Sequence, residues 1–222
     1  MRKLLHLWLS PYSRKVRVVL KEKQLEFELE VEKVWERRPD FLALNPAGLV
    51  PVLVEHDGRV LAESTAICEY LDEVYPSRPL IGFDPTSRAE TRRLVAWFDN
   101  KFGAEVADPL IHEKVMRRLM GQGGPDSGTI RAALHNLHIH LDYIEYLSER
   151  RKYLAGDDFG LADIAAAAHV SCIDYLGDVP WDDYPLAKEW YAKVKSRPSL
   201  RPLLGDHIPG LPPPQHYADL DF

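Results

Sequence analysis

The stretch from residue 45 to residue 71, NPAGLVPVLVEHDGRVLAESTAICEYL, constrains the fold more than any other part of the chain. Pro51 stands directly before an apolar run, and a proline cannot donate a hydrogen bond to a sheet, so it must mark a strand start or a bulge. The bond between Val50 and Pro51 is a candidate cis peptide. An Asp-Gly pair at 57–58 then predicts a hairpin turn into a second strand.

A helix is expected to begin at residue 64, because Ile67, Leu71 and Val74 recur on one helical face. Ser64 stands at the start of this stripe, where a hydroxyl can accept hydrogen bonds from the unpaired N–H groups of the first turn. We therefore expect Ser64 to cap the helix. A helix start of this kind is also a favourable position for an anion.

Ser10 separates the first predicted strand, residues 4–9, from a helix that begins with Pro11 and runs to residue 23. A hydroxyl in this position lies at the positive end of the helix dipole, where a thiolate is favoured. Ser10 is therefore a candidate ligand-binding residue, but serine is also a common N-cap without any chemistry. A further strand over residues 27–31 would complete a βαβ-ββα layer.

Three motifs in this layer resemble those of the thioredoxin-like domain of glutathione S-transferases. They are SPYSRKVR from Ser10, NPAGLVPVL from Asn45 and ESTAICEYL from Glu63. The resemblance implies the cytosolic glutathione S-transferase fold, an α/β thioredoxin-like N-terminal domain followed by an all-α C-terminal domain. It also implies a glutathione site in which Ser10 stabilises the thiolate. The residues of this implied site are Ser10, Lys33, Val50, Pro51, Glu63 and Ser64.

Trp35 lies in the loop after the second strand, where such transferases hold glutathione with basic or polar side chains. Lys33, Arg37 and Arg38 are suited to that role. Trp35 itself is a large apolar side chain in a polar surface loop. It either folds over its own domain or a neighbouring subunit, or stays exposed as a binding anchor, since tryptophan is enriched in interface hot spots. The sequence leaves both interpretations open.

The composition indicates a globular protein of 222 residues, 45% hydrophobic and 28% charged. The 28 basic and 34 acidic residues give a net charge of −6, which disfavours nucleic acid as a partner because phosphate binding needs clustered cations. Cys68 and Cys172 lie in separate apolar segments, so we expect buried thiols in a reducing compartment, the cytoplasm. The short apolar run at the N-terminus predicts a strand and not a signal peptide, and no apolar run is long enough to span a membrane.

The second half of the chain is helical in its periodicity. A stretch rich in proline and glycine over residues 77–85 predicts a linker between a domain of residues 1–76 and a helical domain of residues 86–204. Within the helical domain, we expect one long helix over residues 88–119 and its partner over residues 130–147.

Two groups of polar residues in the helical domain require an interpretation. The histidines His135, His138 and His140 do not share one face and have no cysteine nearby, so we expect a solvated polar face and no metal site. Asp163 follows Gly160 by three residues at the start of an alanine-rich run, which is the spacing of a capping box. We therefore interpret Asp163 as structural.

Residues 205–222 continue beyond the last predicted helix as a proline-rich tail. The prolines at 212–214 enforce an extended path without internal hydrogen bonds. The final residues alternate apolar groups with acidic ones, as a recognition element would, since apolar anchors bind and flanking charges orient. The residues expected to bind a partner are Trp35, Tyr217, Asp219, Leu220, Asp221 and Phe222. The alternative is that the apolar side chains of the tail dock on the chain's own helical domain.

The Trp35 loop and the ending HYADLDF are similar to glutathione-S-transferase-like cell-division factors of alphaproteobacteria that bind the tubulin-like polymer FtsZ. This resemblance implies a homodimer without catalytic residues or a cofactor, which binds FtsZ filaments at the division site and promotes their curvature or bundling during constriction. The alternative is a serine-type glutathione S-transferase or glutathione-dependent isomerase, with Ser10 as the catalytic residue and glutathione bound. The fold alone does not decide between the two functions.

Overall fold

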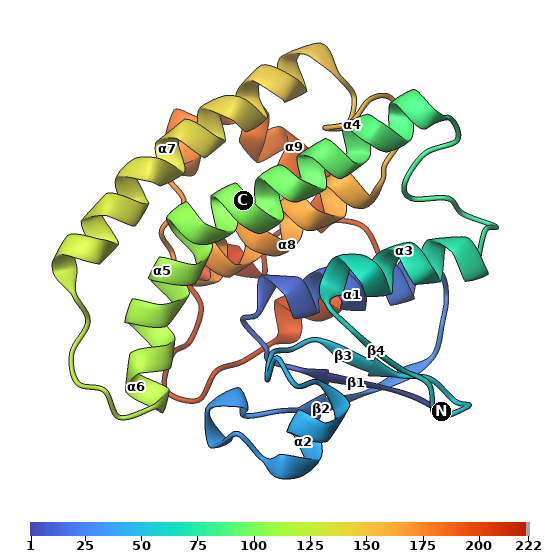
Figure 1. Cartoon of the computed structure of the whole chain (residues 1–222). Coiled ribbons are helices and arrows are strands. Elements are labelled where there is room, and N and C mark those ends of the chain that lie inside the picture. The colour runs from blue at the N-terminus through green and yellow to red at the C-terminus, as the bar shows by residue number, and fades with distance from the viewer. Residues whose placement is uncertain (221–222) are drawn as a thin grey trace.

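The computed structural model, which describes residues 1–220, contains a four-stranded sheet in the N-terminal part of the chain (Figure 1). The strands are β1 (Arg2–His6), β2 (Phe27–Val31), β3 (Val52–Val54) and β4 (Val60–Ala62), in the order β2-β1-β3-β4. Strand β1 is parallel to β2 and antiparallel to β3, which is antiparallel to β4. The strand expected at residues 4–9 therefore lies nearer the N-terminus and ends at His6.

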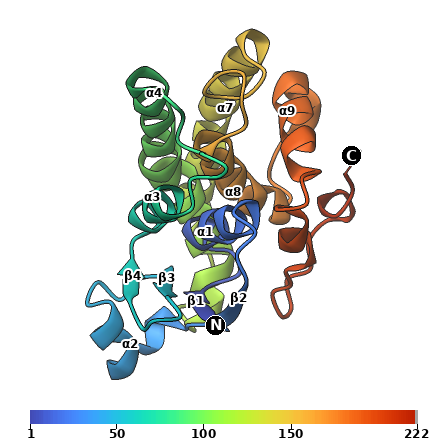
Figure 2. The ribbon, with the colours of Figure 1, turned by 90° about the vertical axis from the view of Figure 1, so that its right-hand side faces the viewer.

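Helices cover both faces of this sheet (Figures 1 and 2). Helices α1 (Pro11–Glu22) and α3 (Ser64–Val74) lie on one side, and the short α2 (Pro39–Leu44) lies on the other. Because successive side chains of a strand point to opposite faces, Leu4 joins the main core whereas Leu5 packs with Phe41 of α2. The alternation of side chains along β1 thus determines which helices pack against each face of the sheet.

Two predicted backbone features of the central stretch are confirmed. The Val50–Pro51 bond is cis and directly precedes β3. Gly58 has a φ of 85° in the turn between β3 and β4. In the same hairpin, the Glu55 N–H donates to the Arg59 carbonyl at 2.8 Å. A positive φ is unfavourable for most residues but not for glycine, so the local sequence is sufficient to encode this turn.

The chain then forms a long helical arm that begins with α4 (Pro85–Ala96) and ends with α6 (Arg117–Leu119). Between them lie α5 (Asp108–Ile111) and two π-helical segments, η2 (Trp97–Ala107) and η3 (His112–Met116). Pro109 has no N–H to offer the Glu105 carbonyl, which instead accepts from the Asn136 side chain at 3.3 Å. The Asp108 N–H reaches back to the Gly103 carbonyl, five residues earlier. The expected long helix is therefore present, with wider turns around its proline.

Helix α8 (Leu161–Tyr175), in which every residue is buried, packs against α1, α4, η2 and α9 (Pro185–Lys195), while α7 (Ser127–Arg150) packs against η2 and α9. The Gly160 N–H donates to the Asp163 carboxylate at 3.2 Å, which confirms Asp163 as a capping residue. A Cβ at Gly160 would lie 2.6 Å from the Leu80 carbonyl, so the close passage of that segment excludes serine or threonine here. Short 3-10 turns complete the fold: η1 (Val34–Glu36), η4 (Trp181–Asp183), η5 (Arg201–Gly205) and η6 (Gln215–Tyr217).

In the part of the chain that the structure describes, no helix is long and apolar enough to cross a membrane.

Among residues 1–220, no three His, Cys, Asp or Glu side chains come together as a metal site requires. His140 is buried, whereas His135 and His138 are exposed on α7. Cys68 and Cys172 are free and buried, as expected. The solvated polar face expected for the three histidines of α7 is therefore found at His135 and His138 and is wrong for His140.

Candidate functional site

A cleft of 520 Å³ lies between the N-terminal domain and the helical arm. Four of the residues predicted for binding line it together, namely Ser10, Lys33, Trp35 and Val50. Apolar side chains from the helical arm and the tail also line it: Ile111, Val115, Met116, Leu119, Ile208 and Pro209. A volume of this size, with a few polar groups among apolar walls, is typical of a small-molecule site.

Ser10 caps α1, which is one of its two predicted roles. Its hydroxyl oxygen accepts a hydrogen bond from the Ser13 N–H at 3.1 Å, and Pro11 is the first residue of the helix. A hydroxyl that accepts one hydrogen bond still has its own hydrogen to donate, so the cap does not occupy the whole group. The capping role is confirmed, and the ligand-binding role stays a prediction.

Tyr12, which sequence reasoning did not select as a site residue, borders both this cleft and a second cavity of 330 Å³. Its hydroxyl lies 3.0 Å from the Asp99 carbonyl and 3.3 Å from the Asp108 carboxylate, and can donate to either. Burial raises the pKa of both Tyr12 and Asp108. A Cβ at Gly103 would lie 2.8 Å from this hydroxyl, so the contact requires glycine there. Tyr12 therefore connects the start of α1 to the helical arm.

The residues predicted for glutathione binding are divided between these two cavities. Glu63 lines the second cavity and not the first. Pro51 and Ser64 are buried and line neither of the two. The remaining three, Ser10, Lys33 and Val50, line the first. The structure therefore brings together only half of the predicted set in one cavity.

The start of α3 differs from the prediction, because Glu63 and not Ser64 is its N-cap. Glu63 has a φ of 74°, and its carboxylate accepts the N–H groups of Thr65 at 3.0 Å and Ala66 at 2.9 Å. The Ser64 hydroxyl donates to the same carboxylate at 3.2 Å. The anion position expected at this helix start is therefore occupied by the chain's own carboxylate, whose negative charge is favourable there.

A buried charge cluster borders the second cavity. The Lys15 side chain is fully buried and forms an ion pair with Asp99. Asp99 also accepts from the Thr65 hydroxyl at 3.2 Å and lies 3.2 Å from Nε2 of His169. Burial acts to raise the pKa of Asp99, but the His169 hydrogen bond and the Lys15 charge outweigh it and hold this pKa below its ordinary value. Asp99 is therefore ionised at neutral pH, and no local motif in the sequence marks this cluster.

Trp35 lies in η1 and is partly buried against the first cleft. Arg37 has a φ of 47°, so the chain turns sharply directly after this segment. Lys33 pairs with Glu36 at 3.2 Å, and both side chains are largely exposed. The position agrees with the interpretation that Trp35 folds over its own domain, with part of the side chain left accessible.

Tyr217 lies in the core and not on the surface. Its side chain is 0% exposed, packs edge-to-face against Tyr175 with ring centroids 5.2 Å apart, and donates to the Leu203 carbonyl at 3.1 Å. The prediction that Tyr217 belongs to a partner-binding surface is therefore wrong, because the ring completes the chain's own apolar core. For this residue, the alternative of docking on the helical domain is the one observed.

The remaining tail residues follow the prediction in part, and Figure 2 shows this segment alongside α9. Pro214 has a φ of −65° and a ψ of 159°, which is the extended path expected for the proline run. Asp219 is exposed and Leu220 is partly exposed. Asp221 and Phe222, also predicted for partner binding, lie outside the described residues.

Comparisons with known proteins agree with this fold. Family models for the N-terminal and C-terminal domains of glutathione S-transferases match residues 9–74 and 108–198. The chain is 51% identical over 225 residues to the FtsZ-localized protein A of Caulobacter vibrioides, with 100% of this chain and 98% of that protein covered. It is 34% identical to glutathione S-transferase 3 of Zea mays, with 97% of this chain and 98% of that protein covered.

Solved structures extend the agreement to three dimensions. A glutathione S-transferase from Rhodospirillum rubrum F11 matches with a TM-score of 0.98 at 58% identity, covering 100% of both chains. FzlA from C. crescentus matches with a TM-score of 0.96 at 51% identity, covering 100% of this chain and 99% of that chain. The fold implied by the three N-terminal motifs is thereby confirmed.

Proposed function

We propose that this chain, which belongs to the glutathione S-transferase family, serves as a cell-division adaptor and not as an enzyme. In this proposal it is a cytoplasmic homodimer that binds FtsZ filaments at the division site, without catalytic residues or a cofactor. Two identical surfaces on one dimer would bridge filaments by geometry and avidity, and so promote their curvature or bundling during constriction.

The observation that carries the proposal is the similarity to FtsZ-localized protein A, which covers the whole chain at 51% identity. Similarity to the maize transferase is lower, at 34% identity. The glutathione S-transferase structure from Rhodospirillum rubrum F11 shares more residues still, at 58% identity, so identity by itself does not separate the two functions. Because one fold hosts many functions and function resides in particular surface residues, the proposal also depends on the residues of the cleft and the tail.

The position of Trp35 adds support, because the Trp35 loop and the first turn of the tail meet at one cleft. Trp35 comes from the N-terminal domain, and Ile208 and Pro209 come from the first turn of the tail. Farther along the tail, Asp219 is exposed and Leu220 partly so. An aromatic anchor combined with an orienting carboxylate is typical of an interaction surface. We propose that Trp35, Asp219 and Leu220 contact FtsZ.

Cosedimentation with FtsZ filaments tests the proposal. Asp219→Lys reverses an exposed charge and is expected to weaken pelleting with filaments, because the local charge would no longer match the partner. Its melting temperature should stay nearly unchanged, since an exposed charge contributes little to stability even where it attracts a neighbour such as Lys195. Trp35→Ala should weaken pelleting more strongly, as loss of an aromatic hot spot does.

The matched control is Asp157→Lys, which reverses another exposed charge, between α7 and α8, and should pellet as the wild type does. Full pelleting of both Asp219→Lys and Trp35→Ala would refute this surface. A wild-type protein that does not pellet at all would refute the function. Light scattering that shows only monomer at micromolar concentration would remove the bridging mechanism.

A second function, that of a serine-type glutathione transferase or isomerase, is favoured by one observation: Ser10, Lys33 and Val50 share a cleft. Calorimetric titration with glutathione, beside an assay of thiol conjugation, separates the two functions. Binding heat together with a turnover that disappears in Ser10→Ala would favour the enzyme. Absence of both heat and turnover, with filament pelleting retained, would favour the adaptor.

A further inference from the structure

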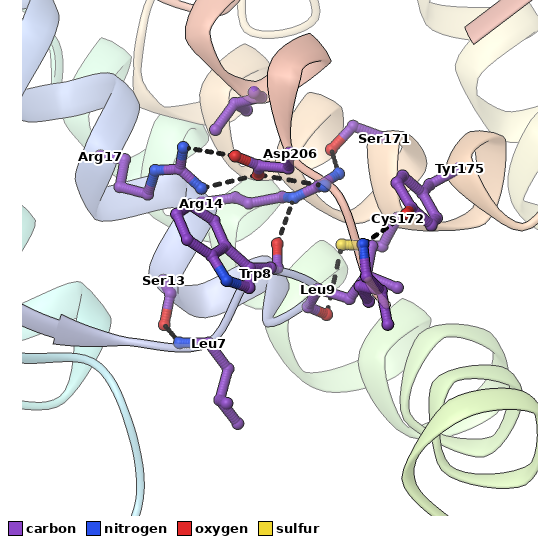
Figure 3. Close-up of polar contacts among 12 residues, drawn as sticks. Leu7, Trp8, Leu9, Ser13, Arg14, Arg17, Ser171, Cys172, Tyr175 and Asp206 are labelled. Atoms are coloured by element: carbon purple, nitrogen blue, oxygen red, sulfur yellow. Dashed lines mark hydrogen bonds and ion pairs between the residues drawn. The ribbon is translucent and has the colours of Figure 1, made fainter. Parts of the chain in front are cut away.

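The tail leaves the helical domain at Asp206, whose carboxylate is buried between two arginines of α1 (Figure 3). Arg17 binds it through two hydrogen bonds, from Nη1 to Oδ2 at 2.7 Å and from Nη2 to Oδ1 at 2.8 Å. Nη2 of Arg14 donates to Oδ2 at 3.3 Å. A two-point contact between a planar guanidinium and a carboxylate fixes the orientation of both groups. The carboxylate of Asp206 is therefore fixed in its orientation as well as in its position.

Arg14 extends this contact to two further segments (Figure 3). Its side chain is fully buried, and Nε donates to the Trp8 carbonyl at 2.8 Å while Nη1 donates to the Ser171 hydroxyl at 2.9 Å. Trp8 lines the first cleft, and Ser171 belongs to the buried helix α8. One guanidinium therefore joins a wall of the cleft, the central helix and the start of the tail.

Two side chains then hold the first turn of the tail, residues 208–211. The Tyr175 hydroxyl accepts from the first N–H of this turn at 2.9 Å and donates to its last carbonyl at 2.7 Å. Arg118 of α6 donates to the two carbonyls between them, at 2.9 and 2.8 Å. These contacts come shortly after Asp206 in the chain, so they are made by the tail along the direction in which it leaves Asp206.

We infer that Asp206 is a positioning residue for the partner-binding tail and that it acts through Arg14 and Arg17. The inference rests on the proposed function. From Asp206 the chain passes the cleft that Trp35 lines and returns to the core at Tyr217, two residues before the exposed Asp219. The direction set at Asp206 therefore determines where Asp219 is presented relative to Trp35.

A role in stability alone accounts poorly for this cluster. Removing charged groups from water costs about as much free energy as their attraction returns, so buried ion pairs stabilise little compared with apolar side chains of the same volume. Here two buried arginines share the carboxylate of Asp206. A tail path that moved Asp206 away would leave the guanidinium groups of Arg14 and Arg17 without that counterion, which disfavours alternative tail positions. The cluster is therefore suited to specifying one path.

The test measures tail placement and partner binding separately, in the full-length Asp206→Asn variant. This change removes the negative charge and keeps the shape of the side chain. Amide hydrogen exchange over residues 207–219 should become about tenfold faster or more, while α8 and the sheet keep their wild-type exchange. Pelleting with FtsZ filaments should weaken by about tenfold.

A disulfide provides a rescue that a purely structural role would not show. A Cβ at Gly177 would lie 4.0 Å from Cβ of Pro214, a separation that a disulfide spans. Gly177→Cys and Pro214→Cys are therefore combined with Asp206→Asn. Residue 177 has a φ of 76°, and the resulting strain is present in both redox states. The oxidised protein should regain slow tail exchange and filament pelleting, and the reduced protein should not.

The inference is overturned by unchanged tail exchange in Asp206→Asn, by faster exchange with undiminished pelleting, or by an oxidised protein with slow exchange that still does not pellet. If Asp206→Asn does not fold, Arg17 is changed to Lys instead, which keeps the positive charge and removes the two-point contact with Asp206. That variant should speed exchange over residues 208–211 and weaken pelleting, and wild-type behaviour would overturn the inference. A wild-type protein that does not bind filaments refutes the proposed function, while the exchange measurement still decides whether Asp206 positions the tail.

Discussion

Arg14 and Lys15 are neighbours on α1, both are fully buried, and each binds a carboxylate that is distant in the sequence. Lys15 binds Asp99, which is 84 residues away in the helical arm. Arg14 binds Asp206, which is 192 residues away at the start of the tail. Two adjacent buried cations therefore connect the same helix to different parts of the molecule, one to the body of the helical domain and one to a terminal segment.

The difference between the two pairs lies in what surrounds each carboxylate. Asp99 is contacted by Lys15 of α1, by Thr65 of α3 and by His169 of α8, so its environment is shared by both domains. Asp206 follows η5, and the segment beyond it is held mainly by individual side chains. A buried ion pair inside a domain interface affects the stability of the whole fold, whereas one at the start of a terminal segment affects a local opening.

The largest effect is expected from Lys15→Met, which leaves the Asp99 carboxylate buried without its cation. The free energy of unfolding of the whole chain should fall by about 3–5 kcal/mol. Urea denaturation at a fixed protein concentration measures this loss. The control, Lys15→Met combined with Asp99→Asn, removes both charges and should recover much of the stability. A loss of less than about 1 kcal/mol in the free energy of unfolding would contradict the distinction between the Lys15–Asp99 pair and the Arg14–Asp206 pair.

An intermediate loss of stability is expected when the pH is lowered. Its cause is His6, which lies on the side of the molecule that holds the tail. His6 is fully buried, and within residues 1–220 neither ring nitrogen has a hydrogen-bond partner. Burial first, and the Arg17 charge second, lower the pKa of His6 from 6.5 to about 4. As pH falls from 6.5 toward 4, the unfolded chain therefore takes up a proton that the folded chain does not. The contribution of His6 to the free energy of unfolding is therefore complete above pH 6.5 and is lost on acidification. The complete loss amounts to roughly 3 kcal/mol.

Urea denaturation at neutral pH and near pH 4.5 measures this acid loss, with His6→Leu as the control. The variant has no imidazole to protonate, so its stability should fall less over the same range. Amide hydrogen exchange of the tail, measured at both pH values, sharpens the comparison between the wild type and His6→Leu, because a proton on His6 would add positive charge beside Arg17. Equal acid losses in the two proteins would assign the effect to other groups.

The smallest effect is expected from Ser10→Ala, at the start of the helix that carries both buried cations. The variant loses one cap hydrogen bond, so the free energy of unfolding should fall by about 1 kcal/mol. Neither Lys15 nor Arg14 loses a partner, and FtsZ pelleting should therefore equal that of the wild type. Pelleting that drops together with faster tail exchange would show that the end of α1 also directs the tail.

Features whose cause lies within a few residues could be predicted from the sequence. Pro51 marks the start of a strand because it cannot donate, and Gly58 permits the hairpin because it has no Cβ. Asp163 caps α8 because it stands three residues after Gly160. The three N-terminal motifs, which lie at fixed spacing along the chain, were enough to identify the family and with it the fold.

Tertiary structure alone decided which polar groups are partners and which apolar groups are buried. Arg17 and Asp206 are 189 residues apart, and nothing within α1 shows that the tail will cover it. Tyr217 stands near acidic residues and looks like a surface anchor, but the path that begins at Asp206 brings its ring against Tyr175. A cap or a turn is determined by neighbours in the chain, whereas a buried side chain is determined by whichever distant segment the fold places beside it.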